Sequence, residues 1–185
     1  MGIICYIQAR GGSKRFPRKN LALWNGKPMV ADAIEKAQAA GVFDYIAVSS
    51  DDPEILQIAV YYGVLPLWRS PQASSDTATD DDVAAEVTRY FPDADYFCKL
   101  YPCIPLLTVN NIIQIVYDYQ PYAGAYFVDM SGQDAGALYL FYAKMYRTLE
   151  TISLNDFPWV RVPIENAIDI NTPEDLETAL RMAND

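Results

Sequence analysis

The chain contains no histidine among its 185 residues. This absence excludes the Ser-His-Asp and Cys-His catalytic arrangements, the HExxH metal sites and any general base that relies on an imidazole. Any catalysis must therefore use carboxylates, cations, backbone amides or a bound metal.

Cysteines and long apolar segments are also scarce. Cys5, Cys98 and Cys103 are odd in number, lack a CxxC spacing and lie mostly in apolar runs, so we expect reduced core residues. No segment approaches the ~20 apolar residues that a membrane span needs, and no long apolar region follows a basic one at the N-terminus. These observations predict a cytoplasmic protein that does not enter a membrane.

Positive charge is in short supply, with 14 basic residues against 24 acidic ones and a net charge of -10. This balance argues against sequence-independent binding to DNA or RNA and against docking on anionic lipid, because both depend on many cations. The length and the 51% hydrophobic content are those of one ordinary globular domain, which we expect to span residues 1–185.

Apolar or β-branched runs alternate with helical patterns along the chain. The predicted strands are Ile3–Ile7, Tyr45–Ser49, Val64–Trp68, Tyr96–Tyr101, Gly124–Val128 and Ala137–Phe141, and residues 129–134 are a short turn. The predicted helices are Pro28–Ala40, Pro53–Tyr62, Asp80–Phe91, Val109–Tyr119, Ala143–Leu149 and Pro173–Ala183. This alternation predicts an α/β fold, Rossmann-like with three αβα layers and a mostly parallel sheet, whose ligands bind at the carboxyl ends of the strands.

A basic, glycine-containing loop follows the first predicted strand. Two adjacent glycines, Gly11 and Gly12, permit a sharp turn and a close approach of backbone N–H groups to an anion. Five of the 14 cations lie within this loop, at Arg10, Lys14, Arg15, Arg18 and Lys19. The loop is neither a Walker A motif nor GxGxxG, and it is interpreted as a site for a polyanionic small molecule rather than an unrelated basic turn.

The run from Ile7 to Asn20 resembles the N-terminal signature of the cytidylyltransferases that activate nine-carbon sugar acids. The family pattern is I-P-A-R-G-G-S-K-x-I-P-x-K-N, from which Gln8 and Phe16 depart here. Weaker resemblances follow in order at 26–29, 48–55, 75–77, 100–106, 134–139 and 168–176, and the stretch 134–139 is similar to the pseudaminic acid branch. The resemblance implies a fold of the nucleotide-diphospho-sugar transferase type.

The resemblance also implies roles for individual residues. Arg10 and Lys19 would be catalytic, holding the phosphates and stabilising the charge that develops. The nucleotide would be bound by Ala9, Gly11, Gly12, Ser13, Asn20 and Ser75, although Ser75 is equally well explained as a turn residue. Helix capping remains the favoured explanation of Asp51 and Asp52, and Tyr101 stands where many members have a glutamine.

A Mg²⁺ ion is the cofactor that the resemblance implies. In family members with two aspartates in the motif at 168–176, that pair holds the ion. Here the metal ligands would be Asp169 and Asn171, and the amide brings an oxygen but no charge, so a weaker site is expected. The alternative for Asn171 is that it merely helps to cap the last helix.

The expected partners are CTP and a sugar acid of the sialic or pseudaminic type, with no nucleic acid. The family usually inserts a long segment between the strand at 124–128 and Asp134, where this chain has only a short turn. Two hypotheses remain open: a transferase that releases pyrophosphate from CTP, and a trimmed nucleotide-binding protein without transfer activity. A homodimer is an alternative to a monomer.

Overall fold

The computed structural model describes residues 2–120, 124–144 and 159–184. A seven-stranded sheet has the order β5-β4-β1-β6-β8-β7-β9. Its strands are β1 (Ile3–Gln8), β4 (Tyr45–Ser50), β5 (Leu65–Trp68), β6 (Tyr96–Leu100), β7 (Gly124–Val128), β8 (Asp134–Tyr142) and β9 (Trp159–Pro163). Only β8 runs antiparallel to its neighbours β6 and β7, so the prediction of a mostly parallel α/β sheet is confirmed.

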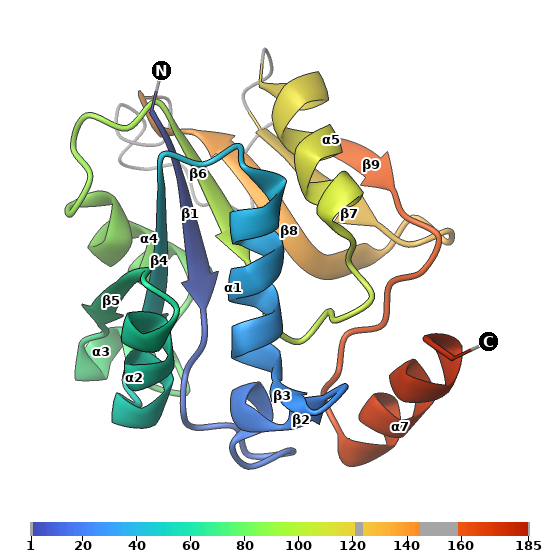
Figure 1. The fold of residues 1–185 in the computed structure, drawn as a ribbon. Coiled ribbons are helices and arrows are strands. Elements are labelled where there is room, and N and C mark those ends of the chain that lie inside the picture. Colours follow the sequence, from blue (N-terminus) through green and yellow to red (C-terminus); the bar gives the residue numbers. More distant parts are fainter. Residues whose placement is uncertain (1, 121–123, 145–158, 185) are drawn as a thin grey trace.

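Helices cover both faces of the sheet (Figure 1). One face packs against α1 (Met29–Ala40), α2 (Pro53–Tyr61) and α5 (Val109–Tyr119), and the other against α3 (Pro71–Ser74) and α4 (Asp80–Thr88). Residues of β1 alternate between the two cores, with Cys5 on the first face and Tyr6 on the second. All three cysteines are free and buried, as expected.

A third, smaller apolar cluster lies below the carboxyl ends of the strands. It joins Trp24 and Met29 to Ile170 and to Ala179 of α7 (Pro173–Met182). The short hairpin β2 (Leu23–Trp24) and β3 (Lys27–Pro28) and the 3-10 helix η1 (Lys19–Leu21) belong to this region. In Figure 1, α7 lies beside this hairpin, so the C-terminal segment returns to the loop that follows β1.

Helix starts follow the predicted capping chemistry. Asp52 caps α2 by accepting a hydrogen bond from the Glu54 N–H at 2.8 Å, with Pro53 in the first turn. Thr172 and Asp175 form a reciprocal capping box at the start of α7. These local bonds satisfy N–H groups that have no partner within the helix.

Several elements differ from the sequence expectation. β9, the hairpin β2–β3, η1 and α3 were not predicted, and β8 is longer than the predicted 137–141. The predicted turn is confirmed: β7 and β8 form an antiparallel pair, and the Asp129 carboxylate accepts hydrogen bonds from Ser131 and from the Gln133 N–H. Of the helix predicted at 143–149, residues 143 and 144 are helical and the remainder lies outside the described residues.

Candidate functional site

The loop after β1 is anchored at both ends by buried groups. The Ala9 N–H donates to the Ser49 carbonyl oxygen at 3.1 Å, and this extends the β1–β4 pairing by one residue. Asn20, only 6% exposed, donates from Nδ2 to the Arg10 carbonyl oxygen at 2.9 Å. These hydrogen bonds hold both ends of the loop in place, so its cationic side chains project from a fixed backbone.

Gly11 lies where a side chain would not fit. A Cβ on this residue would come within 2.9 Å of the Asp52 side chain. The Gly11 N–H donates to Asp51 Oδ1 at 2.8 Å, so a phosphate at that amide would compete with a carboxylate. Neither Gly11 nor Gly12 has a positive φ, so Gly11 serves the close approach to Asp52 and not a left-handed turn.

A cavity of about 460 Å³ opens beside this loop, at the carboxyl end of β1. Five cations and one carboxylate are among its lining residues, which are Gln8, Arg10, Ser13, Lys14, Arg15, Lys19, Asn20, Arg69, Asp76, Tyr101, Cys103 and Asn171. Such an excess of cations in a chain of net charge -10 favours a polyanionic ligand.

Four of the five loop cations line the cavity, and the fifth turns away. Arg18 instead forms an ion pair with Glu54 of α2, both half exposed. Arg10 and Lys14 both contact Asp76, at 3.6 Å and 2.6 Å. The hydrogen bond from Lys14 and the neighbouring charges hold the pKa of Asp76 below its ordinary value, so this carboxylate is ionised and fixes two cations at the cavity wall.

The sequence-predicted residues occupy different places around the cavity. Arg10, Ser13, Lys19, Asn20 and Asn171 line it. Ser75 borders it through its carbonyl oxygen, which accepts from Arg10 Nη1 at 3.4 Å, while its hydroxyl lies 3.2 Å from that of Thr77. Ala9 is fully buried, and Gly12 has open space around its Cα.

Asn171 connects the cations to the expected metal ligand. Its Oδ1 accepts from Arg15 Nη2 at 3.1 Å and from Lys19 Nζ at 3.2 Å, and its Nδ2 donates to Asp169 Oδ2 at 2.7 Å. The described residues contain no group of three or more His, Cys, Asp or Glu side chains that could hold a metal. Oxygen donors on Asp169 and Asn171 suit Mg²⁺, which keeps several waters and takes further ligands from substrate phosphates.

Several residues that line the cavity were not predicted as site residues, among them Arg69, Gln8 and Cys103. Arg69, 2% exposed, donates from Nε and Nη2 to the Ser49 hydroxyl and carbonyl oxygens at 3.1 Å and 2.7 Å. Gln8 and Cys103 also line the cavity. Burial raises the pKa of Cys103 to about 12, so this side chain is a thiol rather than a nucleophilic thiolate. A polar residue directly after a predicted strand was the available signal for Arg69.

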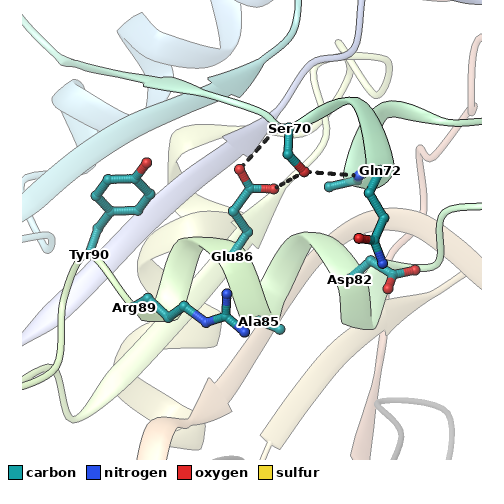
Figure 2. A pocket seen from close by; sticks show the side chains of 8 residues that line it. Ser70, Gln72, Asp82, Ala85, Glu86, Arg89 and Tyr90 are labelled. Atoms are coloured by element: carbon teal, nitrogen blue, oxygen red, sulfur yellow. Dashed lines mark hydrogen bonds between the residues drawn. The ribbon is translucent and has the colours of Figure 1, made fainter.

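A second cavity, of about 510 Å³, lies between α3 and α4 (Figure 2). Its wall contains a structural contact: Glu86 accepts from the Ser70 N–H at 2.9 Å and from the Ser70 hydroxyl at 3.0 Å. Ser70 in turn caps α3 through the Ala73 N–H. None of the sequence-predicted site residues lines this cavity, so the loop cavity is the candidate site.

Curated relatives match between about half and three fifths of the chain. A pseudaminic acid cytidylyltransferase of Campylobacter jejuni is 40% identical over 120 residues, which are 62% of this chain and 51% of that protein. A CMP-N,N'-diacetyllegionaminic acid synthase of Legionella pneumophila is 37% identical over 98 residues, 52% of this chain and 42% of that protein. The chain thus spans about half the length of the curated relatives it matches.

The fold has a solved counterpart over its whole length. A CMP:2-keto-3-deoxy-manno-octonic acid synthetase, solved with CTP, superposes with a TM-score of 0.78 at 16% identity, covering 100% of this chain and 99% of that one. At this identity the likeness concerns the fold alone. The family model described as cytidylyltransferase matches residues 4–137, which include the loop, Arg69 and Tyr101. The chain therefore belongs to the cytidylyltransferase family.

Proposed function

We propose that this protein transfers CMP from CTP to a 2-keto nine-carbon sugar acid of the sialic or pseudaminic type. The observation that carries the proposal is the cavity beside the β1 loop, where five cations and one carboxylate line about 460 Å³. A nucleoside triphosphate brings the negative charge that this wall neutralises. The relatives' activities are consistent with this substrate class.

The proposed reaction needs positioning and charge neutralisation more than covalent catalysis. The hydroxyl oxygen on the acceptor's anomeric carbon bonds to the α-phosphorus while the bond from that phosphorus to the bridging oxygen breaks, releasing pyrophosphate and a proton. Such a transfer suits a site of fixed cations without histidine. Arg10, held by Asp76, and Lys19, held by Asn171, would stabilise the charge that develops.

The donor chemistry of Asp169 and Asn171 fits a divalent cation. The two side chains lie in direct contact, next to the cations that line the cavity. When bound there, Mg²⁺ would neutralise phosphate charge. Asn171 also links the cations to Asp169, because its amide accepts from Arg15 and Lys19 and donates to Asp169.

The decisive experiment measures pyrophosphate release with CTP, Mg²⁺ and a panel of 2-keto sugar acids. Release that depends on the acceptor would support the transferase. CTP binding with no release from any acceptor would favour the alternative, a nucleotide-binding protein of the same fold without transfer activity. The observation that favours this alternative is Asn171, which stands in place of a second aspartate.

Nucleotide preference is a separate prediction. We expect CTP with Mg²⁺ to raise the melting temperature more than ATP, GTP or UTP, because a ligand that binds only the native state stabilises it according to its affinity. Thermal-shift titrations with all four nucleotides at equal concentration test this expectation. Equal shifts, or none, would contradict the assignment of CTP.

A further inference from the structure

A hydrogen-bonded cluster borders the cavity through Gln8 and Tyr101, which line it, and is not explained by phosphate binding. We call it the Asp80 network; its members are Gln8, Asp80, Lys99 and Tyr101. Asp80 Oδ1 accepts from Gln8 Nε2 at 3.1 Å and from the Tyr101 hydroxyl at 2.7 Å. Asp80 Oδ2 accepts from Lys99 Nζ at 2.8 Å. The sheet brings these residues together from the ends of β1 and β6 and from the start of α4.

The hydrogen atoms of this network point inward at Asp80. An ionised carboxylate can only accept, so each neighbour must turn a donor toward it. Burial opposes the charged form of Asp80, but the Lys99 ammonium and three hydrogen bonds outweigh it, and the pKa of the carboxyl lies below its ordinary value. Lys99 itself is 2% exposed and lies over the Tyr139 ring at 3.9 Å, so its charge faces the network and not the cavity.

What remains for a ligand on this wall is a set of acceptors. Tyr101 has one hydroxyl proton, which is used on Asp80, so its oxygen offers only lone pairs. The bond to Asp80 fixes the Gln8 amide with Nε2 toward the carboxylate, and Gln8 Oε1 is a buried atom without a partner in the described part of the chain. Asp80 is not among the residues that line the cavity, so it acts on a ligand through the orientation of Tyr101.

A donor group lines the same cavity. The buried Arg69 guanidinium uses Nε and Nη2 on Ser49, and it contributes to the cavity wall. Cytosine carries an amino group at C4 and acceptors at N3 and O2, whereas uracil carries an oxygen at C4 and a hydrogen on N3. An acceptor wall with a neighbouring guanidinium therefore complements cytosine and opposes the C4 oxygen of uracil.

We propose that the Asp80 network sets base preference: Asp80 holds the Tyr101 hydroxyl as an acceptor, and the Tyr101 oxygen accepts from the exocyclic amino group of a cytosine nucleotide and disfavours uracil. This inference rests on the proposed function, since it assigns the base of CTP to the cavity whose cations hold its phosphates. Gln8 and Tyr101 are also positions at which the chain departs from the family pattern.

The test measures Kd for CTP and UTP by calorimetry in the unaltered protein, in Asp80→Asn and in the matched control Asp81→Asn. In Asp80→Asn the amide NH₂ can donate to the Tyr101 oxygen, which frees the Tyr101 hydroxyl proton for the C4 oxygen of uracil. The ratio of the UTP Kd to the CTP Kd should fall by about tenfold or more in Asp80→Asn and stay unchanged in Asp81→Asn.

A second measurement leaves the chain intact, because Asp80→Asn also leaves Lys99 buried without its counter-charge. CTP dimethylated on its exocyclic nitrogen has no amino hydrogens, and it should bind the unaltered protein at least about tenfold more weakly than CTP, while 5-methyl-CTP serves as the size control. Equal binding of the dimethylated nucleotide and CTP, or of UTP and CTP, would overturn the inference even if the protein transfers CMP. Failure of CTP to bind at all would overturn the proposed function with it.

Discussion

At the scale of single residues, Asn171 determines how the cationic side of the cavity is held. One amide accepts from Arg15 and Lys19 and donates to Asp169, so three charged side chains depend on its orientation. Oxygen and nitrogen assignment is fixed here by chemistry, because cations can only donate and a carboxylate can only accept. The side chain is thus more than a helix cap, the role that falls to Thr172 and Asp175.

Replacing Asn171 by aspartate should make the protein more responsive to Mg²⁺. The change converts the 2.7 Å hydrogen bond to Asp169 into a contact between two carboxylates, which a divalent cation relieves. We expect Asn171→Asp to lower the Mg²⁺ concentration for half-maximal rate, or for half-maximal CTP binding. An unchanged concentration would argue against a shared metal site.

Arg10→Ala should reduce turnover more than nucleotide affinity. A cation that acts on charge developing at the α-phosphate contributes more in the transition state than in the ground state, and such losses are roughly 10²–10³ in kcat. The matched control is Arg18→Ala, since Arg18 is a cation of the same loop that pairs with Glu54 outside the cavity. Steady-state kinetics should give nearly normal kcat and KM for the control, and similar losses in both variants would indicate a diffuse basic patch. Arg15 is unsuitable as the control, because it contacts Asn171.

At the scale of elements, β7 and β9 approach closely because one residue lacks a side chain. A Cβ on Gly124 would come within 2.8 Å of the Trp159 ring and 3.0 Å of the Leu140 carbonyl oxygen. The same ring makes edge contacts with Tyr126, Tyr139 and Phe141. Trp159 therefore fastens the edge strand β9 to the rest of the sheet.

Gly124→Ala should destabilise the fold by about 1–3 kcal/mol, the usual cost of overpacking. Where the added methyl group fits, a glycine-to-alanine change stabilises the protein, because it lowers the conformational entropy of the unfolded chain. The sign of the change in unfolding free energy therefore shows whether the methyl group fits. Gly2→Ala is the control, because a Cβ there would meet its nearest neighbour at an ordinary 3.6 Å. Denaturant unfolding of both variants measures the difference, and a stabilised Gly124→Ala would refute the close packing.

At the scale of the whole molecule, acid should weaken the fold through its bonded carboxylates. Asp80, Asp82, Asp129 and Asp175 all have pKa values below the ordinary 3.8. A depressed pKa contributes stability that is complete above the unfolded value and is lost as pH falls through the folded value. The loss is therefore expected below about pH 4.

The melting temperature should fall as pH is lowered from about 4 toward 2, with Asp80 contributing measurably. Because Asp80→Asn removes one of the titrating groups, the gap in melting temperature between this variant and the unaltered protein should narrow over that range. Asp81→Asn provides the charge-matched comparison. A gap that stays constant with pH would show that Asp80 has the same pKa in the folded and unfolded chain.

Much of the architecture could be predicted because it is encoded locally. The buried strand β1 reads as an apolar run from Ile3 to Ile7, and the helix starts at Asp52 and Thr172 carry their caps within four residues. β9 escaped prediction because Trp159–Pro163 contains a charged residue, Arg161, and a proline, Pro163, both of which weaken the pattern of a buried strand. No described helix is long and apolar enough to cross a bilayer.

The sequence by itself determined the family, the α/β class and the cationic loop, since each depends on residues close together in the chain. Only the tertiary structure decided which partners those residues meet. Arg15 reaches Asn171 across 156 residues, Asp80 reaches Gln8 across 72, and Asp51 occupies the Gly11 N–H that was expected to face an anion. The order of the strands and the placement of the helices bring these residues together. A hydrogen bond between distant residues constrains geometry and not local sequence, so it produces no periodic or compositional pattern from which it could be predicted.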